Sequence, residues 1–130
     1  MSDFVFQTAK DLKVGKYVLI DNVPCRIVDI ETSKPGKHGS AKMRITAIGL
    51  FDGSKRNLLT PSDADVQVPI VERKTAQVIS VDNDSAKLMD VETYEYFDVS
   101  IPEELRGKVE AGKEVEILVS MGKRAIERVR

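Results

Sequence analysis

Short runs rich in β-branched residues, each followed by residues typical of turns, recur along the chain and constrain its fold more than any other feature. Val, Ile and Thr favour strands, whereas Asn, Asp, Gly and Pro favour turns. In the first half we expect strands within residues 12–20, 25–31, 43–51, 55–60 and 66–71. Many short strands in succession favour a small closed all-β barrel over a helical or βαβ fold.

The second half repeats this alternation, with strands expected at residues 75–81, 87–91, 94–100, 114–119 and 125–129. One helical signal interrupts it at residues 102–109, where Pro102 stands at a helix start and acidic residues precede basic ones. Gly107 weakens that helix. Five strands with one short helix inserted late match the plan of an OB-fold.

The balance of charge changes near residue 71, which favours a domain boundary there. Residues 1–70 carry ten basic and eight acidic side chains, and residues 71–130 carry ten and thirteen, giving formal net charges of +2 and −3. The connecting segment is short and not rich in Gly or Ser. We therefore expect two domains, residues 1–71 and 72–130, held in a fairly fixed relation.

Composition argues against several classes of function. A hydrophobic content of 42% supports a packed core. The single cysteine excludes an internal disulfide and, with only one histidine, argues against a metal site, so Cys25 is expected to be a buried strand residue. No apolar run approaches the ~20 residues of a membrane span, and no signal-peptide pattern is present. We expect a cytoplasmic protein with no membrane partner.

Residues 33–42 depart from the strand pattern, and we expect them to form an exposed loop that ends a long β-hairpin and presents Lys37. Pro35 fixes its own φ and pushes Lys34 toward an extended conformation. Gly36 and Gly39 can take the positive φ values that a tight reversal needs. The loop is therefore expected to place Lys37 near its tip.

The same hairpin concentrates positive charge. No acidic residue occurs between Glu31 and Asp52, so the arm gathers the basic residues Lys34, Lys37, Lys42 and Arg44, together with His38. A local positive field of this kind suits a phosphate-rich partner. A nucleotide-binding P-loop is excluded, because Glu31 stands where its first glycine is needed and His38 stands where it needs Ser or Thr.

The uninterrupted run Thr32-Ser33-Lys34-Pro35-Gly36-Lys37-His38-Gly39-Ser40-Ala41-Lys42 resembles the lysine-modification loop of the translation factor 5A family, the relatives of bacterial elongation factor P. Pro35 and Ser40 stand where eukaryotic members typically have Thr and His, so the chain is more similar to the archaeal branch. The resemblance implies an N-terminal SH3-like barrel and a C-terminal OB-fold.

The resemblance also implies a function. Lys37 would be converted to hypusine or deoxyhypusine by transfer of an aminobutyl group from spermidine, with deoxyhypusine synthase as the modifying enzyme and no bound cofactor. The residues that present Lys37 or are recognised with it would be Lys34, Pro35, Gly36, His38, Gly39, Ser40 and Lys42. The modified factor would bind the ribosome, near ribosomal RNA and peptidyl-transfer RNA, and promote peptide-bond formation at stalled sites such as proline runs.

Two other classes of function remain to be weighed. A generic RNA-binding β-barrel could act through the basic hairpin without modification, although Tyr94, Tyr96 and Phe97 form the only aromatic cluster and Phe97 is interpreted as a core residue. An enzyme has less support, because nothing pairs His38 with a nucleophile or an orienting carboxylate. We therefore predict no catalytic residues, no metal site and no enzymatic activity.

Overall fold

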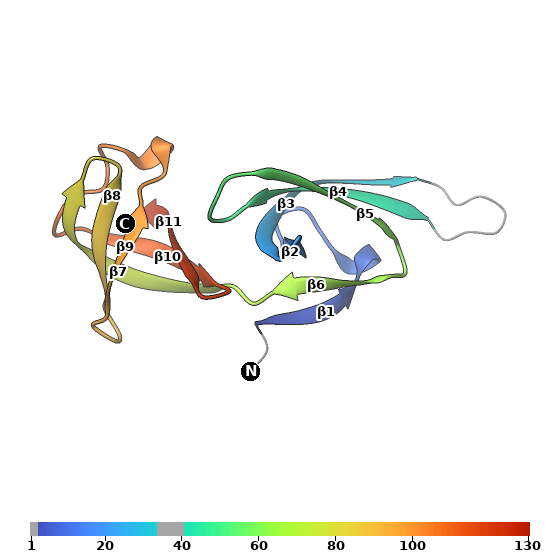
Figure 1. Cartoon of the computed structure of the whole chain (residues 1–130), viewed down its shortest axis with the longest axis horizontal. Coiled ribbons are helices and arrows are strands. Elements are labelled where there is room, and N and C mark those ends of the chain that lie inside the picture. Colours follow the sequence, from blue (N-terminus) through green and yellow to red (C-terminus); the bar gives the residue numbers. More distant parts are fainter. Residues whose placement is uncertain (1–2, 34–40) are drawn as a thin grey trace. The chain divides into compact units, whose positions relative to one another are not determined.

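Antiparallel strands dominate the computed structural model, which describes residues 3–33 and 41–130 and has only two short 3₁₀-helices in that part of the chain (Figure 1). The chain divides into two compact units, Met1–Ile70 and Val71–Arg130. Each unit has its own cluster of buried apolar side chains. The prediction of an all-β protein is therefore confirmed.

The N-terminal unit is built on a four-stranded sheet in the order β2-β3-β4-β5. Its strands are β2 (Tyr17–Ile20), β3 (Val23–Ser33), β4 (Lys42–Gly49) and β5 (Lys55–Pro61). A two-stranded ribbon of β1 (Phe4–Thr8) and β6 (Asp65–Pro69) is joined to it by the 3₁₀-helix η1 (Ala9–Asp11) and contacts the sheet through β2 and β6. The result is a small barrel of the SH3-like kind.

The core of this unit follows the two-residue period of its strands. In β4, Met43, Ile45 and Ala47 are buried while Lys42 and Arg44 are exposed. Successive side chains of a strand point to opposite faces, so one face of β4 supplies the core and the other carries charge. Further core residues come from η1, β2, β3 and β6, and include Ala9, Val18, Ile20, Cys25, Ile27 and Val66.

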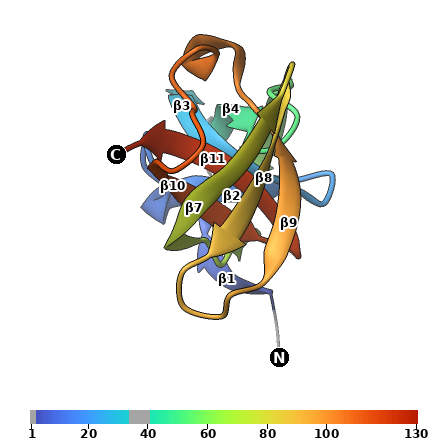
Figure 2. The ribbon, with the colours of Figure 1, turned by 90° about the vertical axis from the view of Figure 1, so that its left-hand side faces the viewer.

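The C-terminal unit contains five strands in the order β11-β10-β7-β8-β9. They are β7 (Glu72–Asp82), β8 (Ser85–Asp90), β9 (Tyr96–Ser100), β10 (Glu114–Ser120) and β11 (Lys123–Val129). Figure 2 shows these strands curling around one another, and β9 and β11, at the two ends of the order, also contact each other. The sheet therefore closes on itself, as an OB-fold barrel does.

The helix expected at residues 102–109 is mostly absent. Only Glu103–Leu105 is helical, as the 3₁₀-helix η2, and the backbone of Arg106 is already extended. Gly107 has φ +82, a left-handed conformation that ends helices. Val109 is then buried in the core, so tertiary packing takes the chain away from the helix that the local sequence favours.

Two features of the N-terminal unit differ from the expectation. The sequence pattern indicated no strand ahead of residue 12, yet β1 begins at Phe4. The strand expected at residues 66–71 could have completed the first sheet, but β6 hydrogen-bonds to β1 in a separate ribbon. The ribbon is short, and one of its faces is exposed to solvent. Its strands therefore have too few core-facing positions to produce a long alternation of apolar and polar residues, so the sequence pattern does not reveal β1.

Candidate functional site: the base of the β3–β4 arm

Strands β3 and β4 form a long antiparallel arm whose ends flank residues 34–40. The pairing runs out to Thr32 opposite Met43 and Ser33 opposite Lys42. Of the predicted site residues, the structure therefore places Lys42, at the start of β4. The others lie outside the described residues: Lys34, Pro35, Gly36, Lys37, His38, Gly39 and Ser40.

The base of the arm is held by bonds on both of its sides. The Ser33 hydroxyl donates to the carbonyl oxygen of Lys42 at 3.2 Å. The Ser62 amide donates to the carbonyl oxygen of Ala41 at 2.8 Å, and Pro61 of β5 lies opposite Lys42. Three strands thus fix the residues that stand on either side of residues 34–40.

The outer face of this base carries mixed charge around an apolar side chain. Glu31, Arg44 and Leu59 stand opposite one another across β3, β4 and β5. Together with Ser33, Lys42 and Met43 they line a shallow hollow of about 330 Å³. The positive charge of Lys42 and Arg44 is therefore exposed next to the loop, and Glu31 offsets part of it.

Leu59 is a surface residue that the sequence pattern did not mark. Its side chain is 69% exposed although it lies in an apolar pair, because its neighbour Leu58 takes the core-facing position. Arg44 was expected only as part of the general positive field. The two-residue period of β4 and β5 would have placed Arg44 and Leu59 on the same face of the sheet if the register between these strands had been known.

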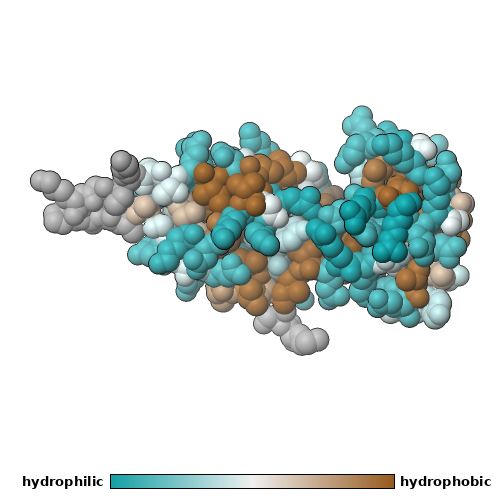
Figure 3. All heavy atoms as spheres, turned by 180° about the vertical axis from the view of Figure 1, so that it is seen from behind, coloured by the Kyte–Doolittle hydropathy of each residue, from teal (hydrophilic) through white to brown (hydrophobic). Residues whose placement is uncertain are grey.

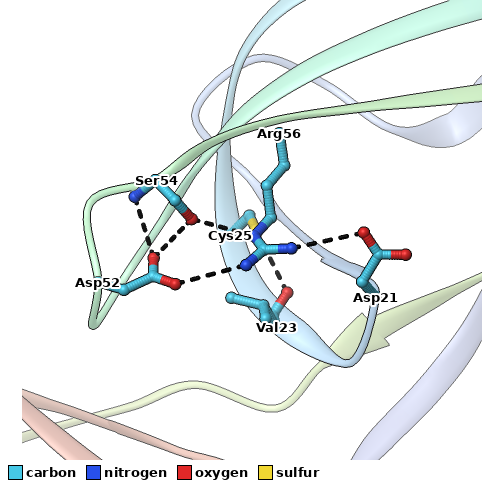
Figure 4. Close-up of polar contacts among 6 residues, drawn as sticks. All are labelled: Asp21, Val23, Cys25, Asp52, Ser54 and Arg56. Carbon is cyan, nitrogen blue, oxygen red and sulfur yellow. Dashed lines mark hydrogen bonds and ion pairs between the residues drawn. The ribbon is translucent and has the colours of Figure 1, made fainter.

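The opposite end of the sheet is closed by a polar cluster around Arg56 (Figure 4). The Arg56 guanidinium lies 3.4 Å from the Asp21 carboxylate and 3.6 Å from that of Asp52, and its Nε donates to the Ser54 hydroxyl at 3.0 Å. The backbone amide and hydroxyl of Ser54 both donate to Asp52, which lowers the pKa of that carboxyl. These contacts join two turns and have a structural role.

Cys25 lies beside this cluster and is fully buried. Its thiol donates to the carbonyl oxygen of Val23 at 3.2 Å. Burial raises the pKa of the thiol, an effect that the Arg56 charge partly offsets. The expectation that Cys25 is a buried strand residue is confirmed, and its thiol is kept in the unreactive protonated form.

The aromatic residues of the C-terminal unit are divided between core and surface. Phe97 packs partly against the core, as expected, and the Arg124 guanidinium lies 4.5 Å from the centre of its ring. Tyr94 and Tyr96 are exposed. Only two aromatic rings are thus open to a ligand in this cluster, a small platform for base stacking.

Within residues 3–33 and 41–130 no group of three or more His, Cys, Asp or Glu side chains is arranged to hold a metal ion. No helix in the same part of the chain is long and apolar enough to cross a membrane. The chemistry that the described site offers is that of exposed cations, which bind anionic oxygens through charge and hydrogen bonds.

Comparison with known proteins covers the whole chain. Residues 2–64 match the family model described as translation initiation factor 5A-like, N-terminal. Residues 70–130 match the model described as eukaryotic elongation factor 5A hypusine, DNA-binding OB fold. The second match begins at residue 70, next to the point where the chain divides into its two compact units.

Individual relatives agree with these matches. The chain is 57% identical to translation initiation factor 5A of Methanocella arvoryzae, over 88% of this chain and 89% of that protein. It is 57% identical to the same factor of Archaeoglobus fulgidus, over 92% and 94%. A solved structure, the eukaryotic translation initiation factor 5A from Methanococcus jannaschii, has a TM-score of 0.91 at 44% identity and covers 100% of this chain and 97% of that one. The chain therefore belongs to the translation initiation factor 5A family, a family of hypusine-bearing factors that act in translation on the ribosome.

Proposed function

We propose that this protein promotes peptide-bond formation on stalled ribosomes, notably at proline runs, through an aminobutyl group carried by Lys37. The observation that supports this most is the construction of the arm. Three paired strands and two bonds, Ser33 to Lys42 and Ser62 to Ala41, hold the ends of the Lys37 loop. A fixed base lets the barrel stay outside a narrow site while one side chain reaches into it.

The chemistry of the modification fits the proposed role. In deoxyhypusine formation, the Lys37 ε-nitrogen gains a bond to the four-carbon end of spermidine, and the bond from that carbon to the spermidine nitrogen breaks, releasing a three-carbon diamine. The product keeps the lysine nitrogen basic, lengthens the side chain and adds a second amine. Two amines on a longer stem can donate to phosphate and ribose oxygens of peptidyl-transfer RNA, which a plain lysine would not reach.

The proposed partners are the ribosome, with its RNA and peptidyl-transfer RNA, and deoxyhypusine synthase. The exposed Lys42 and Arg44, on one face of β4 at the base of the arm, are suited to contacts with RNA phosphates. The loop residues around Lys37 would be read by the modifying enzyme. Spermidine supplies the group and no cofactor is proposed to stay bound.

Peptide mass spectrometry of the protein from its native source tests the modification. We expect one lysine, Lys37, to carry the added mass of an aminobutyl group, with or without one oxygen. Lys34 and Lys42 are internal controls on the same or neighbouring peptides and should carry their ordinary mass. An unmodified Lys37 in active protein would contradict the proposal.

A generic RNA-binding module is the second candidate, favoured by the exposure of Lys42 and Arg44 on one face. In that case RNA affinity should fall with salt and with Lys42→Gln or Arg44→Gln, and should not depend on Lys37 being modified. Affinity for the ribosome measured with modified and unmodified protein at matched salt distinguishes the two functions.

A further inference from the structure

A second hollow, of about 350 Å³, lies in the N-terminal unit between the β1–β6 ribbon, η1 and the start of β2. It shares no residue with the hollow at the base of the arm. Its least exposed residues are the buried Leu12 and the half-buried Tyr17 and Val68. Four exposed polar residues complete the lining: Gln7, Asp11, Lys13 and Lys16. The volume falls within the range of about 300–1,000 Å³ that is usual for small-ligand sites.

A tight turn brings Lys13 and Lys16 together at this hollow. The Lys16 amide donates to the carbonyl oxygen of Lys13 at 3.1 Å, and Gly15 between them has φ +91, which glycine adopts without strain. The first and last Cα atoms of such a four-residue turn lie within about 7 Å of each other. The Gly15 amide also donates to the carbonyl oxygen of Ile27 at 2.9 Å, and the Ile27 amide donates to that of Lys16 at 2.8 Å. Strand β3 thus fixes the backbone that carries both lysines.

The charge at the hollow is mainly positive. Within residues 3–33 and 41–130, no carboxylate forms an ion pair with Lys13 or Lys16, although Asp11 lines the same hollow. A third cation lies next to Tyr17. The Arg26 guanidinium donates to the Tyr17 hydroxyl at 3.4 Å and lies 5.7 Å from the centre of its ring. Three cations around one carboxylate attract an anionic ligand.

Apolar surface alone does not mark a site on this unit, because apolar side chains reach its surface in several places, as Figure 3 shows for one face. The hollow is distinguished by the polar groups beside its apolar residues. Two ammonium groups suit a phosphate, a carboxylate accepts hydrogen bonds from ribose hydroxyls, and the Gln7 amide can donate to and accept from the edge of a base. The ring of Tyr17 offers apolar contact to a base or a ribose.

We propose that this hollow is a nucleotide pocket, which binds one nucleotide of a single-stranded RNA with its phosphate on Lys13 and Lys16 and its ribose beside Asp11. The Asp11 carboxylate would repel a bare phosphate, but it becomes a partner once the ligand carries hydroxyl groups. Because the 2′-hydroxyl is the group that separates RNA from DNA, the pocket favours RNA.

A free nucleotide presents the same chemistry, and RNA is chosen as the source because the family acts on the ribosome. The inference rests on the proposed function for this choice alone. It makes no use of Lys37, so the pocket is tested on protein in which Lys37 is unmodified.

Titration of the full, unmodified chain with an adenosine hexaribonucleotide, followed through the backbone amide signals in NMR spectra, tests the pocket. We expect the largest changes at residues 7–17 and at Val68. The double variant Lys13→Gln, Lys16→Gln should bind about tenfold more weakly or worse, and the slope of log affinity against log salt should fall by about one for each lysine. The matched control is Lys55→Gln, an exposed lysine on β5, which should keep the affinity and slope of wild type. Changes confined to other residues, or a double variant that binds like wild type, overturn the proposal.

Two further ligands test the ribose contact and the source of the nucleotide. The deoxyadenosine hexamer should bind more weakly than the ribose form, and Asp11→Asn should reduce this preference, since a neutral amide oxygen is a weaker acceptor than a carboxylate. A preference that Asp11→Asn leaves intact contradicts the placing of the ribose. Adenosine monophosphate should bind more weakly than the hexamer, and equal affinity would make the free nucleotide the ligand of the same pocket. None of these results bears on the modification of Lys37, which mass spectrometry of the native protein tests separately.

Discussion

Side-chain alternation along β4 decides which way the charges of the arm point. Lys42 and Arg44 face outward because Met43 and Ile45, between and after them, are buried in the core. A shift of one residue would bury both charges and expose both apolar side chains, so the register is strongly specified. The outward direction of the cations at the base of the loop thus follows from the burial of their neighbours.

Lys37→Ala should leave the stability of the protein almost unchanged. If Lys37 is an exposed loop residue, its removal costs no core packing, and surface substitutions usually change the free energy of unfolding by less than about 0.5 kcal/mol. Ile45→Ala, in the core at the base of the same arm, should cost about 2–5 kcal/mol and shows that the measurement can detect a loss. Chemical denaturation of the three proteins makes the comparison. A large loss in Lys37→Ala would show that Lys37 is structural.

At the scale of single residues, the sequence predicted the described part of the site better than its surroundings. Cys25 is buried as expected. Lys42 is exposed as expected, but it is the first residue of β4, whereas the sequence pattern assigned it to the loop at residues 33–42. Leu59 was missed because apolar residues next to each other give no indication of which one faces the core. That choice is made by the pairing of β5 with β4, which a single sequence does not display.

Among the elements, the turn after β8 shows how a buried carboxylate can hold a connection. Asp90 is only 3% exposed and accepts hydrogen bonds from the amides of Glu92 at 2.8 Å and Thr93 at 3.3 Å. The Lys74 ammonium lies 3.6 Å from its other oxygen. These partners, the amide of Glu92 foremost, lower the pKa of the Asp90 carboxyl. The bonds hold the chain through Tyr94, which has a left-handed backbone with φ 62.

Asp90→Asn should destabilise the protein by about 1–3 kcal/mol at neutral pH, because hydrogen bonds to a charged, buried acceptor are replaced by weaker ones. Since folding lowers the pKa of Asp90, the stabilisation is present above the unfolded value of about 3.9 and is lost as pH falls through the folded value. The difference between the two proteins should therefore shrink below about pH 4. Urea denaturation at several pH values measures it, with Asp98→Asn, an exposed Asp on β9, as control. A difference independent of pH would show that the charge is not responsible.

Strands were more predictable than helices in this chain, for a physical reason. Most strands are long enough to show several alternations, and turn residues such as Asp52-Gly53 mark where they end. The helical signal at residues 102–109 depended only on the residues at the helix start and on the order of charges. Each of these effects stabilises a helix by about 1 kcal/mol or less. Burial of Val109 and the left-handed Gly107 outweigh them, and only η2 remains.

On the scale of the whole molecule, the two units have separate cores, one formed from η1, β2, β3, β4 and β6 and one formed mainly from the strands β7 to β11. The change in charge near residue 71 already indicates two parts from the amino-acid sequence. The nature of each barrel came from strand count and from the resemblance of the loop. Strand order and the β1–β6 ribbon could not be predicted, since they depend on contacts between segments far apart in sequence.

A fragment of residues 71–130 should fold by itself, because all five of its strands pair with one another and its buried residues form one cluster. At 60 residues it should be less stable than the whole chain, since small domains bury a smaller share of their surface. Circular dichroism should show β-structure and a cooperative thermal transition. A fragment without such a transition would show that the domain boundary is not a folding boundary.

The most direct test of the central claim sets modified wild type, unmodified wild type and Lys37→Arg side by side in a proline-run translation assay, with ribosome affinity measured in parallel. Arginine keeps the positive charge, but its guanidinium, with a pKa above ~12, is not available as the amine that accepts an aminobutyl group. If Lys37 must be modified, only the modified protein rescues stalled synthesis fully, and Lys37→Arg fails even after treatment with the modifying enzyme. Equal rescue by all three proteins would contradict the account and favour a module that binds RNA through charge alone.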